Sequence, residues 1–562
     1  MIDISVVTRH LYKIQDLLCI DSVVQKQAVF LKSIMLKIQS LIRSLAQCMT
    51  TLSILWLSSC GQISVNTFNP PTPPASWVEP LPATQAHNGK LSALTNWWQQ
   101  FNDPLLIQLI ESAQKVSPDI ESAKVRVIAA QTAVTIADSQ LLPSLTAEIS
   151  ASRGRSGELL STPNGLVFPT SNNASIGANA SWELDVWGKN KAAKNEEEAK
   201  LVGSNALWHE ARVIIAAQTA AQYINYRLCE NLSTLAKQQA DSANETARLS
   251  DLTAKAGFLA PASASQSMAQ AAEAASQFKK QALQCKLIIK SLVALTAMSE
   301  PALQDALAKN SGVVPMPVGI DVPTIPANLL AQRPDVLNAE RNVDASSFEI
   351  TISEAQRYPR LSLVGNIGLS YNSYANEISH NQRHAALDGL TWAVGPIAAS
   401  LPIFDAGLRE ANITAAKAQY AAAKSIYESV ARNAVREVEE AMATLNIAAL
   451  RLEDVSKAAD GFSVVLAATE IRYKANLANL FELEEARRAS LQAHANVFVL
   501  KNEQALAWVS LYRAMGGGWT EALNTPILIF DRDLKQTELN NSVKTPPNQI
   551  QVPNPVQVPA QQ

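Results

Sequence analysis

The sequence predicts a mainly α-helical protein with two internal repeats, whose four strands per chain contribute to a membrane β-barrel shared between several chains. Three observations support this fold class. Pro118 and Pro143 recur as Pro334 and Pro359, and the offset is 216 in both cases. Two proline-free runs of about 69 residues follow, each too long to fold onto a single globular core. Four shorter stretches alternate apolar and polar residues, which is the period of a β-strand.

The repeat continues beyond the prolines. Gly188 and Leu252 recur as Gly407 and Ile471 with an offset of 219, so the second copy has a slightly longer segment between its strands. Repetition of this kind indicates two copies of one structural unit, each about 200 residues long. We therefore expect both copies to contain the same elements in the same order.

The expected elements follow from these patterns. The first unit, residues 104–300, is predicted to have strands at about 144–153 and 174–186 and helices at about 118–141, 188–256 and 262–297. The second unit, residues 329–519, is predicted to have strands at about 360–371 and 392–403 and helices at about 334–357, 407–475 and 480–515. Residues 301–328 are predicted to be a linker between the two units.

The two long helices set the shape of the non-membrane part. A helix of about 69 residues is about 100 Å long at ~1.5 Å per residue. Such a helix buries an apolar face only by packing laterally, as in a coiled coil or a helical barrel. Abundant alanine in both regions favours close helix packing.

The strands have one polar and one apolar face. Thr146, Glu148, Asn179 and Asn366 are expected on the face that meets water inside a barrel, with lipid on the other face. An open four-stranded sheet in lipid would leave edge N–H and C=O groups unpaired, at several kcal/mol each. Because a barrel needs at least about eight strands, several chains must share one. The alternative is a soluble protein whose hairpins dock on a helix.

The N-terminal region has the pattern of an export signal. Residues 1–59 read as a leader, with Met35 as an alternative start, and a short apolar run precedes "LSSC". This stretch resembles a lipoprotein processing box, which predicts covalent lipid on Cys60. The alternative is an ordinary signal with an incidental cysteine. Residues 60–103 are proline-rich and predict an extended tether, and residues 520–562 predict a disordered tail.

Composition argues against several function classes. The net charge of −3 gives no basic surface for nucleic acid. We find no Cys-x-x-Cys pair, Walker loop, HExxH or GxSxG motif, so we expect no metal site, no cofactor and no enzymatic activity.

Several motifs in order resemble the outer-membrane efflux ducts of the TolC/OprM-like family. They are "SWELDVWGK" (181–189), the segment that begins "LLAQRPDVLNAERN" (329–342), "LPIFDAGLREANI" (401–413) and "YRAMGGGW" (512–519). The resemblance covers residues 60–525. It implies a homotrimer with a twelve-stranded barrel and a periplasmic coiled-coil tunnel of twelve helices. With the lipoprotein box, it implies the branch that serves RND-type multidrug pumps.

The resemblance also implies partners and a location. The duct would dock a periplasmic adaptor protein and an inner-membrane RND pump, and would be anchored in the outer membrane with a long periplasmic extension. Gly61, rather than an acidic residue, follows the lipidated cysteine, which favours the outer membrane. The alternatives are a duct for metal ions or secreted proteins, or a structural lipoprotein without a pore.

A closable end is expected where the long helices turn. The stretch "YKANLANLFELEEARR" places Tyr473, Glu482 and Glu485 where the family carries its periplasmic gate, and three copies would form a ring of carboxylates. Asn476 stands in place of the usual glycine, and Ala478 where some members carry an arginine. The alternative is that these glutamates are a solvated helix face.

Cys229 and Cys285 average to position 257, close to the turn between two antiparallel helices. They should lie at similar heights on neighbouring helices, which permits a disulfide in an oxidising periplasm. The alternative is a pair of buried thiols.

Overall fold

The computed structural model describes residues 97–155, 160–162, 165–167, 170–317, 333–375 and 383–518. The predicted leader, Cys60, most of the predicted tether and the C-terminal tail lie outside these residues. The lipid anchor at Cys60 therefore stays a prediction.

Both repeats contain the same elements in the same order. The first consists of α5 (Pro118–Ser139), β1 (Ser144–Arg155), β4 (Thr170–Leu184), α6 (Lys189–Lys255) and α7 (Pro261–Thr296). The second consists of α10 (Pro334–Ala355), β5 (Arg360–Ala375), β6 (Arg383–Ser400), α11 (Leu408–Lys474) and α12 (Leu480–Ala514). A short hairpin of β2 (Leu160–Thr162) and β3 (Gly165–Val167) lies between β1 and β4. The long helices α6 and α11 have 67 residues each.

Local chemistry fixes the helix ends. Pro118 and Pro334 stand at the first turns of α5 and α10, where no N–H is needed. Gly188 (φ 74°) and Gly407 (φ 89°) precede α6 and α11 in the left-handed region, which favours glycine. Among the described helices none is by itself long and apolar enough to cross a bilayer, and the one pair that passes together by length and composition is bent by 115°.

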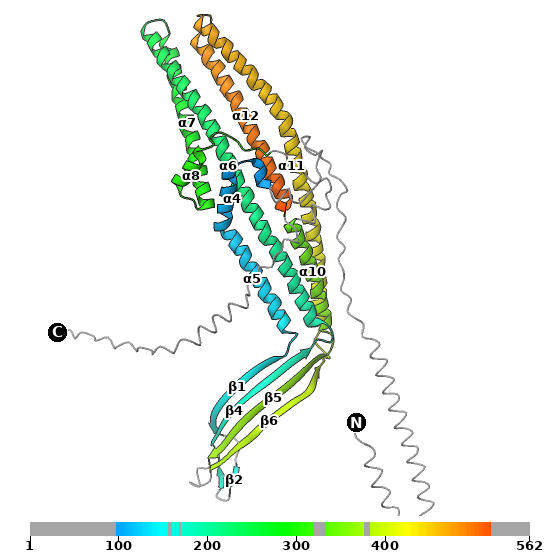
Figure 1. The fold of residues 1–562 in the computed structure, drawn as a ribbon. Helices are drawn as coiled ribbons and strands as arrows, with labels where there is room; N and C mark the ends of the chain where they lie inside the picture. Colours follow the sequence, from blue (N-terminus) through cyan, green and yellow to red (C-terminus); the bar gives the residue numbers. More distant parts are fainter. Residues whose placement is uncertain are drawn as a thin grey trace, which may run out of the picture. The chain divides into compact units, whose positions relative to one another are not determined.

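The four long strands form one antiparallel sheet in the order β1-β4-β5-β6. The helices adjoining the sheet have the corresponding order, because α5 packs on α6, α6 on α10 and α10 on α11. Figure 1 shows the sheet continuing from one end of this helical layer, with α5 and β1 on one side and α10, α11 and β6 on the other.

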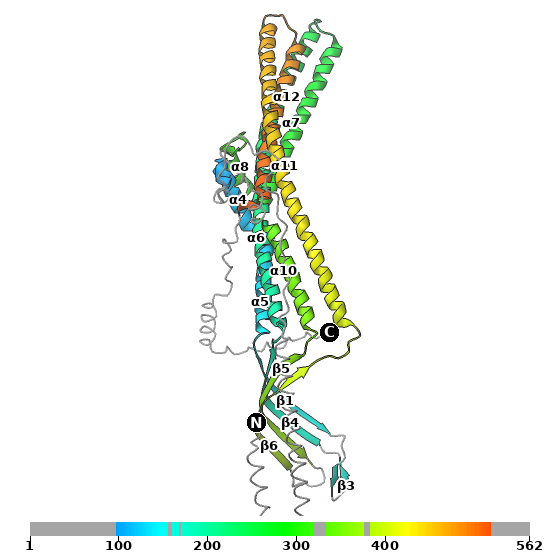
Figure 2. The ribbon, with the colours of Figure 1, turned by 90° about the vertical axis from the view of Figure 1, so that its right-hand side faces the viewer.

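The main hydrophobic core lies along the middle of α6, away from the sheet. It combines α6 with α12, α11, the helix α4 (Pro104–Val116) and the helix α8 (Glu300–Ala308). Its large buried side chains include Trp97, Leu109, Tyr223, Leu303 and Tyr512. The core therefore joins both repeats with the segments that flank them. Figure 2 shows α4 and α8 gathered on one side of the long helices.

The structure corrects three sequence predictions. The predicted tether, residues 60–103, ends in a 3-10 helix at Trp97–Phe101, because the aromatic side chains of Trp97 and Phe101 are buried in the core. The helices α4 and α8 were not predicted, and α8 occupies part of the predicted linker 301–328. The strand predicted at 392–403 instead spans Arg383–Ser400, because the weak alternation of apolar and polar residues in this stretch gave no clear start or end.

Candidate functional site

The helical tips are two hairpins with matching turns. The α6–α7 turn uses Gly257 (φ 82°), and the α11–α12 turn uses Asn476 (φ 60°) at the corresponding position. Asparagine is one of the few residues that enter the left-handed region readily, so Asn476 can take the position that Gly257 holds in the first turn. Both turns close with the same backbone bond, from Phe258 N to Thr253 O at 3.0 Å and from Leu477 N to Arg472 O at 2.7 Å.

The predicted gate residues lie around the second tip. Tyr473 is half-buried at the end of α11, while Glu482 and Glu485 are exposed in the first turns of α12. Glu482 lies 3.3 Å from Arg472 Nη2, and Glu485 lies 3.4 Å from Arg488 Nη1. Each of these carboxylates is thus accompanied by an arginine of its own chain.

Glu484, the remaining glutamate of this stretch, was not predicted as a gate residue. It is 4% exposed, and its carboxylate accepts hydrogen bonds from three side chains of α6: Gln239 Nε2 at 2.8 Å, Ser242 Oγ at 2.7 Å and Thr246 Oγ1 at 3.3 Å. These bonds connect the second hairpin to the first. The buried neighbours Leu483 and Ala486 were the sequence signal that this face of α12 points inward.

A cavity of about 500 Å³ adjoins this contact between α6, α7 and α12. Its lining combines alanines with amide and hydroxyl side chains, and Glu484 is part of it. Arg487 reinforces the contact, since its Nη1 donates to Ser242 Oγ of α6 at 3.2 Å. Its Nη2 lies 3.6 Å from Glu470 of α11, within the second hairpin. Around this cavity, polar bonds therefore supplement apolar packing in joining the two hairpins.

Cys229 and Cys285 are joined by a disulfide between α6 and α7, with their Cα atoms 5.5 Å apart. The two cysteines therefore lie level on neighbouring helices, as their distance from the turn at Gly257 led us to expect. The bridge holds the first hairpin together on the tip side of the core.

The strand residues predicted for the barrel lumen share one face of the sheet. Thr146 is directly opposite Asn179, which is directly opposite Asn366, and directly opposed residues point to the same side. Asn179 Nδ2 donates to Glu148 Oε2 at 3.4 Å. All four side chains are exposed in the single chain.

The other face of the sheet is apolar and equally exposed. Leu145 is 76% exposed, Ile149 77% and Trp392 72%. The register places Ile149 opposite Ile176 and Trp392 opposite Ile367, so apolar side chains form continuous rows across the strands. One face of the sheet therefore suits water and the other suits hydrocarbon.

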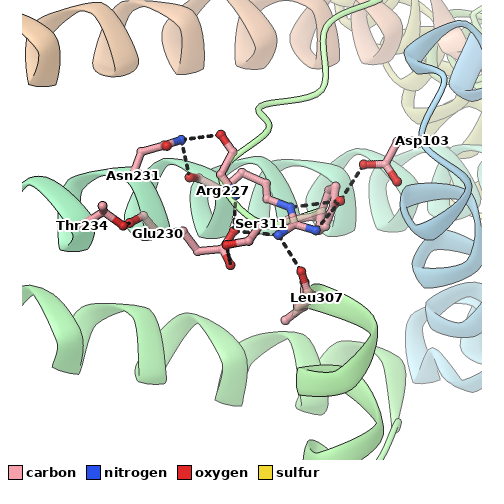
Figure 3. A network of polar contacts seen from close by, with 9 residues as sticks. Asp103, Arg227, Glu230, Asn231, Thr234, Leu307 and Ser311 are labelled. Carbon is pink, nitrogen blue, oxygen red and sulfur yellow. Dashed lines mark hydrogen bonds and ion pairs between the residues drawn. The ribbon is translucent and has the colours of Figure 1, made fainter. Parts of the chain in front are cut away.

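A buried polar network fixes the flanking segments to the middle of α6 (Figure 3). Arg227 is fully buried, and its Nε and Nη2 donate to Tyr223 OH while its Nη1 donates to Glu230 Oε2 at 2.6 Å and to Leu307 O at 2.9 Å. Tyr223 OH in turn donates to Asp103 Oδ2 at 2.5 Å. The network thus connects α4 and α8 through α6, a role that the sequence analysis missed.

The same network perturbs the acidities of its members. Burial, together with the bond to Asp103, raises the pKa of the Tyr223 hydroxyl well above its usual range. Burial lowers the pKa of Arg227, but hydrogen bonds and charge interactions with Glu230 and Tyr223 outweigh it, so the net shift of that pKa is upward. Arg227 is therefore a permanent cation that anchors the network.

The comparisons with known proteins point to one family. The model described as "Outer membrane efflux protein" matches residues 109–297 and 325–517. Nodulation protein T of Rhizobium leguminosarum bv. viciae is 27% identical over 444 residues, which cover 78% of this chain and 88% of that protein. The solvent efflux pump outer membrane protein SrpC of Pseudomonas putida is 25% identical over 486 residues, covering 84% of this chain and 98% of that protein.

Comparison with solved structures points to the same fold. The crystal structure of the Campylobacter jejuni CmeC outer membrane channel matches with a TM-score of 0.72 at 23% identity, over 85% of this chain and 98% of that one. Together with the family model, this likeness shows that the chain belongs to the outer membrane efflux protein family, the TolC/OprM-like channels of the outer membrane.

Proposed function

We propose that this protein is the outer-membrane channel of a tripartite efflux pump. It conducts drugs or other small molecules passively to the exterior, receiving them from a periplasmic adaptor protein and an inner-membrane RND transporter. The relatives support this function, since SrpC is named as part of a solvent efflux pump and another relative, MdtQ of Escherichia coli, as a multidrug resistance outer membrane protein. The duct itself carries out no chemistry.

The single observation that carries the proposal is the sheet with two exposed and opposite faces. The apolar face, with Leu145 at 76% and Ile149 at 77% exposure, needs lipid, while the face of Thr146 and Asn179 needs water. The edges β1 and β6 have no partner strand within the described part of one chain. Since unpaired edges are not tolerated in hydrocarbon, several copies must share one barrel, and we propose the homotrimer with three times four strands that the family resemblance implies.

The tips are proposed to form the closable end of the duct. Tyr473, Glu482 and Glu485 of three copies would surround a narrow axis there, and the Glu484 contacts would hold each second hairpin against the first. Carboxylate rings of this kind attract cations, so the entrance would favour cations over anions.

We further propose that lipid on Cys60 anchors the chain in the outer membrane and that the helices extend into the periplasm. The sequence "LSSC" supports this lipidation, because it ends a short apolar run of the kind found in export signals.

Planar bilayer recording of the purified protein tests the proposed function. The result expected is discrete ion conductance from a trimer that survives mild detergent. A well-folded preparation that never conducts would contradict the proposal and favour a structural lipoprotein. Transport assays in cells with the neighbouring adaptor and pump genes then separate small-molecule efflux from export of metal ions or proteins.

A further inference from the structure

A second cavity, of about 450 Å³, lies where the strands meet the long helices, at the opposite end of the helical layer from the tips. Its walls come from the β4–α6, α10–β5 and β6–α11 connections, which Figure 1 shows together at the end of the sheet. Two motifs to which the proposed channel gives no role, "SWELDVWGK" and "LPIFDAGLREANI", therefore meet at this cavity. Its volume is within the range of small-molecule sites.

The strand residues of this cavity lie on the polar face of the sheet. Glu183 is an even number of residues from Asn179 along β4, and Arg360 is an even number from Asn366 along β5. The register between β4 and β5 is unbroken over this stretch, so the alternation of faces holds. Glu183 and Arg360 therefore share the face of the predicted lumen residues, which suits water rather than hydrocarbon.

The carboxylates of the cavity are already occupied. Glu183 Oε1 lies 2.7 Å from Lys189 Nζ, and its Oε2 lies 3.4 Å from Arg360 Nε. The two oxygens of Asp185 accept hydrogen bonds from two backbone N–H groups in the first turn of α6, both at 2.9 Å. These two carboxylates therefore have little acceptor capacity left for a ligand.

The cations of the cavity, in contrast, have donors to spare. Arg409 donates through Nε to a backbone carbonyl of the α10–β5 connection at 2.8 Å and through Nη1 to Asp405 at 2.6 Å, but its Nη2 has no partner in the described part of the chain. The Arg360 side chain is 65% exposed, and its long contact with Glu183 leaves both Nη atoms free. Spare cationic donors without spare acceptors favour an oxyanion as the ligand.

We propose that this cavity binds a solute that carries a phosphate or carboxylate group, with Arg360 and Arg409 as the main donors. A guanidinium suits this role because its planar fork matches two oxygens of either group. In the proposed trimer the site would occur three times in the wall of the duct, where the barrel joins the helical tunnel. The placement inside a duct rests on the proposed channel, whereas the binding itself does not.

Titration of the purified full chain with inorganic phosphate, in a maltoside detergent and followed by ³¹P NMR line broadening, tests the site. Arg360→Gln should weaken binding at least about tenfold, because it removes a charge-assisted donor pair. Arg357→Gln is the matched control and should stay within about twofold of the parent protein, since Arg357 is an exposed arginine of the same connection that does not line the cavity and pairs with Glu410.

Glu183→Gln should change binding in the opposite direction. It removes the carboxylate that repels the anion and competes for Lys189 and Arg360, so phosphate should bind more tightly than in the parent protein. A variant that merely disturbs the fold would not strengthen binding. Phosphate that does not bind the folded parent, or that binds the parent and Arg360→Gln equally well, overturns the proposed site.

The same titration in phosphatidylethanolamine vesicles separates a solute from a lipid headgroup. Binding should persist there, because the cavity lies on the polar face of the sheet; its loss would assign the site to the lipid phosphate and overturn the solute as ligand. Conductance recorded in parallel separates this inference from the proposed function. A protein that conducts but binds no phosphate loses only the site, whereas one that binds phosphate but never conducts keeps the site and loses the channel.

Discussion

Removing the Glu484 carboxylate should loosen the contact between the two helical hairpins near the tip. Its two short bonds, to Gln239 at 2.8 Å and Ser242 at 2.7 Å, involve a side chain that is 4% exposed, so that water competes little for them. Hydrogen bonds to charged groups contribute about 1.5–3 kcal/mol each. Counting the longer Thr246 bond as little, Glu484→Ala loses about 3–6 kcal/mol of contact between the hairpins. Every 1.4 kcal/mol is tenfold, so the population in which the two hairpins have separated rises about 10²- to 10⁴-fold per chain.

Single-channel recording of Glu484→Ala in planar bilayers measures this release as higher conductance or a larger open fraction than the parent protein. Glu245→Ala is the matched control, because Glu245 is an exposed glutamate of α6 beside the same contact, and in the described structure it bonds only to Arg248 of its own helix. Ser242→Ala should reproduce part of the effect, since it removes one of the two short bonds. Conductance that stays at the parent value in Glu484→Ala, with the trimer intact, would refute the reasoning.

Three further predictions concern charge, acidity and the bridge. Glu482→Gln and Glu485→Gln should weaken divalent-cation block of the channel, and block that is unchanged in both removes them from the gate. Burial and the Arg212 charge lower the pKa of His209 to about 4. On acidification this histidine is therefore protonated at a higher pH in the unfolded chain than in the folded one. As a result, about 2–3 kcal/mol of the free energy of unfolding is lost between pH 6.5 and 4. His209→Gln should flatten the dependence of the free energy of unfolding on pH between 6.5 and 4. An equally steep dependence in the variant would show that His209 does not cause it. Mass spectrometry without reduction should find Cys229 bonded to Cys285, whereas two alkylated thiols would refute the bridge.

The periodic parts of the fold could be predicted from the sequence. The repeat prolines set the starts of α5 and α10, and the proline-free runs predicted α6 and α11 to within a residue or two. The polar face of the strands was also recoverable, because alternation with a period of two depends only on neighbouring residues.

What the sequence did not indicate depends on contacts between distant segments. Trp97 looks like part of a proline-rich tether until α6 and α12 provide the core that buries it. Arg227 and Glu484 each bond to residues that lie far away along the chain, at Leu307 and at Ser242. No local pattern distinguishes Arg227 from the exposed charges on α6, whereas the apolar neighbours Leu483 and Ala486 could have marked the face of Glu484 as inward-pointing.

Native mass spectrometry of the lipidated protein, released from membranes in mild detergent, measures how many copies build the wall of the duct. Three copies per particle is the number that the family resemblance implies, and four strands from each chain would then close a twelve-stranded barrel. A stable single copy, with its apolar strand face left in contact with water, would contradict the shared barrel on which the proposed channel depends.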